Sequence, residues 1–141
     1  MKISTKGRYA LRMMLDLALQ EGKRPVALRE IADRQEISVK YLEQIVSVLA
    51  RAGYLKSIRG PQGGYVLTRE PKDYTVGDIL RLTEGSLAPV ECLETERNLC
   101  PRADHCVTLK LWKELDQAVR QVVDHRTLED LVREQKEEEQ H

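Results

Sequence analysis

The residues with the strongest chemical character in this sequence are three cysteines that fall within one short stretch. Cys92, Cys100 and Cys106 are separated by seven and then five residues, and His105 directly precedes the last of them. Thiolate and imidazole groups are the usual protein ligands of zinc and of iron–sulfur clusters. Zinc ribbons normally carry Cys-x-x-Cys knuckles, which this spacing lacks, so the pattern favours an iron–sulfur cluster over a zinc Cys₃His site. The third interpretation is three free thiols that bind no metal.

The fourth ligand of such a cluster is open at this stage. His105 is a candidate because its neutral imidazole suits iron. Adjacent side chains point in different directions on a regular strand or helix, so His105 and Cys106 converge on one cluster only through an irregular turn. The competing ligands are a bound water, a small thiol, or the nearby carboxylates of Glu91, Glu94, Glu96 and Asp104.

A second set of residues has the character of a DNA-reading surface. Residues 29–64 predict two short helices joined by a turn and followed by a hairpin, and Ser38 is placed to cap the second helix. Apolar side chains recur at helical spacing from Leu42 to Leu49, which leaves the opposite face for DNA. We expect DNA contacts from Ser38, Lys40, Tyr41 and Gln44 on this helix.

The hairpin is interpreted as a wing. Two short apolar segments flank a turn that holds three glycines and a proline, and Arg59 at its tip suits the narrow, electronegative minor groove. A plain surface turn is the alternative interpretation. The residues expected to contact DNA here are Arg59, Gly60, Pro61, Gly63 and Gly64, with Lys6 and Arg8 near the N-terminus as secondary phosphate contacts.

These residues need helices to position them. Ser4 or Thr5 can cap a first helix, with an apolar stripe at Leu11, Met14, Leu15 and Ala18, and Thr75 can cap a short packing helix that ends near Gly85. A long helix is predicted over residues 107–125. Thr127 can then cap a final helical turn, and residues 134–141 are expected to form a frayed, charged tail.

The long helix is expected to hold a homodimer together. It carries an apolar stripe with a tryptophan, and little chain remains to cover it. The alternative is a core helix packed on its own subunit. The residues expected at the dimer seam are Leu109, Trp112, Leu115, Val119 and Val122.

Charge is distributed unevenly along this chain of 141 residues. The net charge is zero, but residues 1–69 hold 13 Lys or Arg against 6 Asp or Glu, while residues 70–141 hold 10 against 17. A basic half attracts phosphates and an acidic half aids solubility. The absence of phenylalanine and the single tryptophan leave few large core side chains, which again favours a dimer. No stretch is long enough to cross a bilayer, and a cytoplasmic protein is expected.

The expected fold class is therefore mainly α with a small β-wing. We expect a winged helix-turn-helix DNA-binding domain at 1–85, a cysteine loop at 86–106, and a dimerisation helix with the charged tail at 107–141. An enzyme is not expected, because the sequence holds no phosphate-binding glycine fingerprint, no Gly-x-Ser-x-Gly elbow and no His-Glu-x-x-His motif.

Several motifs resemble one known family over nearly the whole chain. Residues 4–10, Ser38 with residues 41–44, residues 59–61 with 63–65, and the three cysteines are similar to the Rrf2 family of transcription regulators. The resemblance implies a homodimeric winged-helix regulator with its recognition helix in the major groove and its wing in the minor groove. It also implies a cluster of the 2Fe-2S type at the cysteines.

The similarity is greatest to the iron–sulfur-sensing members, with a departure at the fourth ligand. Those members supply a histidine three residues after the last cysteine, where this chain has Leu109. Other members lack the cysteine set and sense through a partner enzyme. The alternative function is therefore a cluster-free regulator that uses zinc, thiol oxidation or a partner protein.

Overall fold

Helices make up most of the chain, and one hairpin projects from them. The computed structural model describes residues 2–20, 24–94 and 107–140. Its elements in chain order are α1 (Thr5–Leu19), α2 (Leu28–Gln35), α3 (Val39–Arg51), β1 (Leu55–Ile58), β2 (Gly64–Leu67), the 3₁₀ turn η1 (Pro71–Asp73), α4 (Val76–Glu84), the 3₁₀ turn η2 (Glu91–Leu93), α5 (Val107–Val123) and α6 (Leu128–Glu139). The expected fold class, mainly α with a β-wing, is confirmed.

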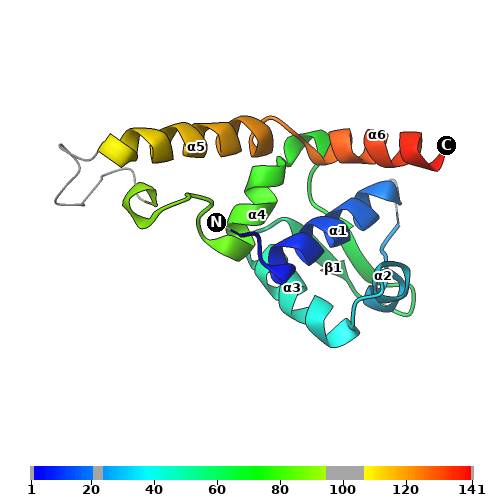
Figure 1. Ribbon diagram of the computed structural model, residues 1–141. Coiled ribbons are helices and arrows are strands. Elements are labelled where there is room, and N and C mark those ends of the chain that lie inside the picture. The colour runs from blue at the N-terminus through cyan, green and yellow to red at the C-terminus, as the bar shows by residue number, and fades with distance from the viewer. Residues whose placement is uncertain (1, 21–23, 95–106, 141) are drawn as a thin grey trace.

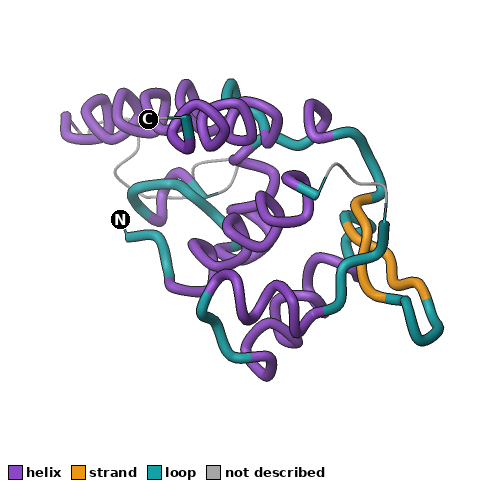
Figure 2. Tube along the Cα trace, turned by 90° about the vertical axis from the view of Figure 1, so that its right-hand side faces the viewer, coloured by secondary structure: helices purple, strands orange, loops and turns teal. Residues whose placement is uncertain are grey.

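The helices are arranged as a body with a long arm along one side. Helices α5 and α6 follow each other nearly end to end, and the N-terminal part of α5 extends beyond the body formed by α1 to α4 (Figure 1). Helix α6 packs back on α1. The hairpin stands off at one corner of the body (Figure 2).

The core lies around α1 and α3. Met13 and Met14 of α1 and Leu42, Ile45 and Leu49 of α3 are all 0% exposed. Of the stripe expected on α1, Met14 and Ala18 are buried, while Leu11 and Leu15 are half-buried. Ala10, Met13 and Leu17 are buried as well. Helix α1 packs against α4, α6 and α3 at once, so its buried face is wider than a single stripe.

Side-chain caps set the starts of several helices. The Ser38 hydroxyl accepts from the Tyr41 amide at 3.1 Å and caps α3, as the sequence predicts. In α4 the Thr75 hydroxyl accepts from the Asp78 amide at 2.9 Å, and the Asp78 carboxylate accepts from the Thr75 amide at 3.0 Å. This reciprocal pair is a capping box.

Helix α6 corrects the expectation of a frayed tail. Thr127 and Asp130 form a second capping box, and the helix runs on to Glu139, well past the single turn that we expected. Leu128 is 0% exposed and anchors the helix on the core. An ion pair between Arg126 and Glu134 adds further support along the helix. The expectation was wrong because charged residues on an exposed helix face resemble a disordered tail in sequence.

Tyr74 ties the base of the hairpin to the body. Its ring is 0% exposed. Its hydroxyl donates to the Tyr54 carbonyl at 2.8 Å and accepts from the Thr68 and Arg69 amides, both at 3.1 Å. The Tyr54 ring lies edge-on to that of Tyr74, with 5.4 Å between centroids.

We expect Tyr74→Phe to lower the free energy of unfolding by about 1–3 kcal/mol, because buried backbone groups lose their partner. Urea unfolding at a fixed protein concentration measures the effect. Tyr65→Phe is the matched control, since the Tyr65 hydroxyl has no hydrogen bond within the described residues. Equal stabilities of Tyr74→Phe and the wild type would show that the hydroxyl does not hold the hairpin.

Candidate nucleic-acid interface

The exposed face of α3 and the start of α1 form one shallow groove. Its lining residues are Lys6, Lys40, Glu43, Gln44, Ser47, Val48 and Arg51. The structure thus brings Lys6, which is distant in sequence, next to the expected reading residues Lys40 and Gln44. Glu43 also lines the groove, although we did not expect it to contact DNA. It lies one helical turn after Val39, the first residue of α3. A ligand that lies in the groove can therefore contact both cationic and amide side chains.

Tyr41 is less exposed than expected for a free reading residue. Its ring packs edge-on against Tyr9 of α1, with centroids 5.5 Å apart and planes at 79°. The Arg12 guanidinium lies over the Tyr9 ring at 5.3 Å. This contact fixes the first turn of α3 against α1, and Tyr41 stays half-buried.

A buried carboxylate fixes α2 against α1. Asp16 is 2% exposed. It accepts two hydrogen bonds from the Arg34 guanidinium, at 3.0 Å from Nε and 2.7 Å from Nη2, and one from the Gln35 amide at 3.0 Å. These hydrogen bonds raise the pKa of Arg34, which stays charged. A bidentate ion pair thus holds α2 against α1.

The start of α1 is anchored on the end of α4. The Glu84 carboxylate accepts from the Ser4 amide at 3.1 Å and from the Ser4 hydroxyl at 2.5 Å. Gly7 is buried beside this contact. The anchor places Lys6 in the groove, while the Arg8 guanidinium donates to the Thr5 hydroxyl at 3.1 Å.

The wing is a two-stranded antiparallel hairpin. Leu55 pairs with Leu67 and Ile58 pairs with Gly64, so residues 59–63 form the turn, and Arg59, Gly60 and Pro61 are exposed there. The wing is attached to the segment before α2, because Val26 and Tyr65 exchange backbone hydrogen bonds of 3.0 and 2.9 Å.

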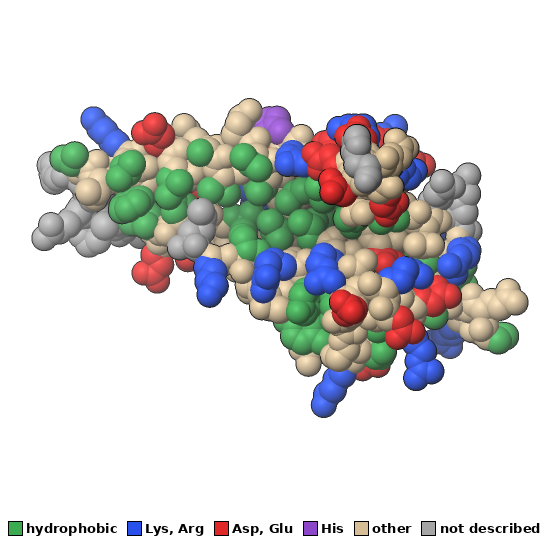
Figure 3. All heavy atoms as spheres, turned by 45° about the vertical axis from the view of Figure 1, so that its right-hand side comes forward, with side chains coloured by type: hydrophobic (Ala, Val, Ile, Leu, Met, Phe, Trp, Pro, Cys, Tyr) green, Lys and Arg blue, Asp and Glu red, His purple; other side chains and the backbone are tan. Residues whose placement is uncertain are grey.

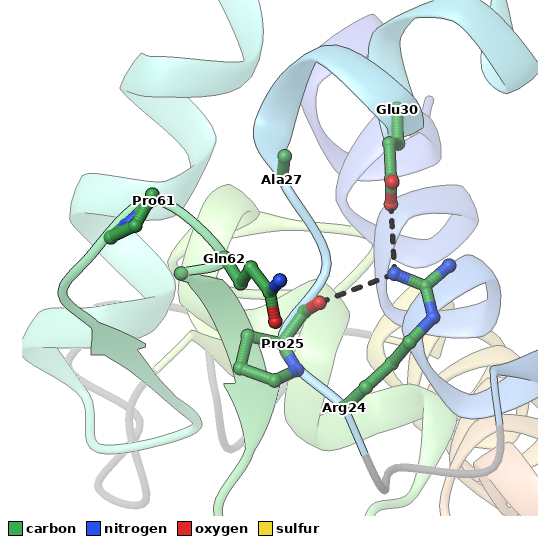
Figure 4. A pocket seen from close by; sticks show the side chains of 7 residues that line it. Arg24, Pro25, Ala27, Glu30, Pro61 and Gln62 are labelled. Atoms are coloured by element: carbon green, nitrogen blue, oxygen red, sulfur yellow. Dashed lines mark hydrogen bonds and ion pairs between the residues drawn. The ribbon is translucent and has the colours of Figure 1, made fainter.

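Two wing glycines have a structural role within the chain. A Cβ on Gly64, whose φ is +157°, would lie 2.4 Å from the Val26 carbonyl atoms, and one on Gly63 would lie 2.0 Å from the Ile58 oxygen. Both glycines therefore allow a close approach to the chain's own backbone. Beside them, Pro61 and Gln62 face Pro25 and Ala27 across a cleft (Figure 4). An ion pair at 3.3 Å joins Arg24 to Glu30 on the far side of this cleft.

Helix α5 carries an exposed apolar stripe. Val107, Leu111, Leu115 and Val122 are 83%, 55%, 38% and 56% exposed. Figure 3 shows hydrophobic side chains along the arm and on the body beneath it. Trp112 and Val119, which we expected at the seam, are half-buried, and Leu109 is 6% exposed within one chain. The stripe available to another chain therefore includes Val107 and Leu111, which we did not expect from the sequence although both continue the four-residue spacing of Leu115.

The C-terminal end of α5 is locked to α4. The Arg81 guanidinium donates to both Asp124 oxygens, at 2.5 and 3.1 Å. This pairing lowers the pKa of Asp124 and raises that of Arg81. A Cβ on Gly77 would lie 2.2 Å from Asp124 Oδ1 and 2.6 Å from Arg81 Nη1, so a side chain here would displace this ion pair.

The cysteine site is described only in part. Cys92 lies in η2 as a free, half-buried thiol. A recess close to η2 is lined by Arg81, Leu87, Leu93, Glu94, Asp116 and Arg120, among others. Cys100, His105 and Cys106 lie outside the described residues. Within residues 2–20, 24–94 and 107–140, the structure gathers no group of three His, Cys, Asp or Glu side chains suited to a metal.

The fold and the groove define a winged helix-turn-helix DNA-binding protein. Helices α2 and α3, the hairpin and the cationic side chains beside α3 are the elements of that class. None of the described helices is both long enough and apolar enough to span a bilayer.

The chain belongs to the Rrf2 family, described as iron-dependent transcriptional regulators, which matches residues 3–134. CymR, an HTH-type transcriptional regulator of Bacillus subtilis, is 49% identical over 93% of this chain and 89% of CymR. Its solved structure, titled as that of the global cysteine regulator, has a TM-score of 0.78 and covers 94% of this chain and 96% of CymR at 48% identity.

Regulators named IscR are similar as well. IscR of Sodalis glossinidius is 40% identical over 94% of this chain and 79% of IscR. The solved structure of T. potens IscR has a TM-score of 0.78 and covers 97% of this chain and 90% of that chain at 41% identity. The protein is a transcriptional regulator of the Rrf2 family.

Proposed function

We propose that the protein acts as a homodimer that reads a two-fold operator, with α3 of each subunit in the major groove and each wing in the minor groove. The observation that carries this proposal is the groove that brings Lys6 beside Lys40 and Gln44. Cationic side chains neutralise phosphates, and an amide side chain can pair with a base edge. One surface thus offers both positioning and reading groups.

Several of the expected contact residues have separate tasks in this proposal. Lys40, Lys6 and Arg8 contact phosphates and set the register, while Gln44 donates to and accepts from an adenine edge. Arg59, exposed in the wing turn, enters the minor groove. Ser38 serves mainly as the cap of α3, and Gly63 and Gly64 hold the wing in place.

The dimer is proposed to form through the exposed stripe of α5. Apolar side chains at positions 107, 111, 115 and 122 lie along one side of a helix that extends beyond the body (Figure 1). A two-fold axis places the same stripe of a second chain opposite. The two recognition helices then contact half-sites whose centres lie one helical turn of DNA, or a multiple of it, apart.

Selection of duplexes from a random pool tests this function. Wild-type protein should enrich an inverted repeat, and hydroxyl-radical footprinting of the selected duplex should protect two half-sites. Sedimentation should give two chains per duplex. A direct repeat, or one chain per duplex, would contradict the proposal.

We propose further that the cysteine set binds an iron–sulfur cluster of the 2Fe-2S type. Three thiolates suit iron, and the described one, Cys92, is a free thiol on a turn. The cluster would be held by Cys92, Cys100 and Cys106, with His105 or a nearby carboxylate as the fourth ligand. When bound, it supplies a centre that responds to iron and to oxidation.

The alternative is a cluster-free regulator that uses zinc, thiol oxidation or a partner enzyme. The chain is similar both to CymR, at 49% identity, and to IscR, at 40% identity, and this CymR-like alternative fits the comparisons equally well. With a cluster, with zinc or with thiol oxidation, the chemical signal would arise at the cysteine set, to which Cys92 of η2 belongs. We place the protein in the cytoplasm, where cysteines are kept reduced.

The visible spectrum of anaerobically purified protein, with iron, sulfide and zinc analyses, distinguishes the iron–sulfur proposal from the cluster-free alternative. A cluster gives a coloured protein with iron and sulfide, and Cys92→Ala should then lose them. Colourless protein without iron would exclude the cluster, and stoichiometric zinc would assign the site to zinc.

A further inference from the structure

The first residue of the recognition helix is an exposed aliphatic side chain. Val39 is 37% exposed. Among the described residues, four of the other exposed large hydrophobics lie on α5 and the fifth is Ile58 on the wing. Val39 is thus an apolar side chain that neither the core nor the proposed dimer seam uses.

The position of Val39 places it at the leading end of α3. It follows the capping residue Ser38 and precedes Lys40, which lines the groove. Residues at the N-terminal end of a recognition helix lie closest to base edges. A β-branched residue is also a poorer helix former than alanine, so the helix itself does not require valine here.

We propose that Val39 reads a thymine by contact with its methyl group. The major groove presents the thymine C5-methyl as its apolar feature, and aliphatic side chains pair with it. The proposal rests on the placement of α3 in the major groove. It assigns to Val39 a share of the sequence preference that Gln44 and Lys40 do not provide.

Uracil substitution tests this directly, because deoxyuridine lacks only the methyl group. In the selected duplex, each thymine is replaced in turn and affinity is measured by fluorescence anisotropy. Wild-type protein should lose about fourfold at one thymine of a half-site, equal to ~0.8 kcal/mol for one buried carbon at 1.4 kcal/mol per factor of ten. Substitution in both half-sites should cost about fifteenfold.

Val39→Ala should bind the thymine duplex at least about fourfold more weakly per half-site than the wild type. Replacement of that thymine by uracil should not change the affinity of this variant further. Ile58→Ala is the matched control: it removes an exposed aliphatic side chain from the wing, and the minor groove shows no thymine methyl. Its uracil profile should equal that of the wild type.

The proposal is overturned if wild-type protein is indifferent to uracil at every position. It is also overturned if Val39→Ala keeps the wild-type profile, because another residue then contacts the methyl group. Helical circular dichroism confirms that the variant is folded. Failure of the wild type to enrich any duplex would instead count against the proposed function, so the two failures are distinguishable.

Discussion

Leu111→Asp is expected to convert the protein from a dimer to a folded monomer. Leu111 is 55% exposed in one chain, so the substitution leaves the subunit core intact. In the dimer, each copy loses about 1.5–3 kcal/mol of apolar burial and also places a carboxylate in an apolar seam. Because the seam is two-fold, the loss occurs twice, and the dissociation constant should rise at least about 100-fold.

Sedimentation velocity over a range of protein concentrations measures this change. Gln117→Asp is the matched control, since Gln117 is an exposed residue of the same helix that lies off the apolar stripe. It should leave the dimer unchanged. A Leu111→Asp variant that remains dimeric would place the seam on another surface.

Gly64→Ala is expected to detach the wing from the body. The new Cβ would lie 2.4 Å from the Val26 carbonyl atoms, and a φ of +157° is rarely adopted by residues with a side chain. Relief of the clash breaks the pair of backbone hydrogen bonds between Val26 and Tyr65. We expect the free energy of unfolding to fall by about 3 kcal/mol or more.

Gly60→Ala separates the two causes of this destabilisation. Gly60 also has a positive φ, of +116°, but a Cβ there would meet nothing within 4 Å. It should cost about 1–3 kcal/mol of backbone strain alone, measured by urea unfolding. If the two variants were equally stable, the close approach at Val26 would not be what holds the wing.

Local features of this protein were predictable from sequence. The Ser38 cap and the glycine-rich hairpin depend on residues close together in the chain. Local hydrogen bonding and apolar spacing determine such features, so one sequence is enough to detect them.

Features that depend on distant residues were not predictable. The contact of Ser4 with Glu84 joins residues 80 positions apart, and the bridge from Val26 to Tyr65 explains Gly64 only once the fold is known. No periodicity in sequence signals either contact. Of the four exposed apolar residues of α5, the sequence pattern identified Leu115 and Val122 but not Val107 and Leu111. It also placed Leu109 in the seam, although the packing of α5 on its own chain buries that residue.

The cysteine site is still a prediction from sequence. Of the four proposed ligands, the structure describes Cys92, which is a free, half-buried thiol in η2. Ligand spacing indicates the chemistry of a site, but the fourth ligand depends on how the chain folds around the cluster.

The most direct test of the DNA-reading groove compares Lys40→Ala and Gln44→Ala with the wild type in fluorescence titrations of the selected duplex and of random DNA across salt concentrations. Lys40→Ala should weaken binding to both DNAs alike and reduce the salt slope by about 1 for each phosphate that is no longer neutralised. Gln44→Ala should cost about 1–3 kcal/mol on the selected duplex and little on random DNA. Lys113→Ala, which removes an exposed cation from α5, should change neither. Wild-type affinities and salt slopes in both groove variants would contradict the claim that the groove beside α3 reads DNA.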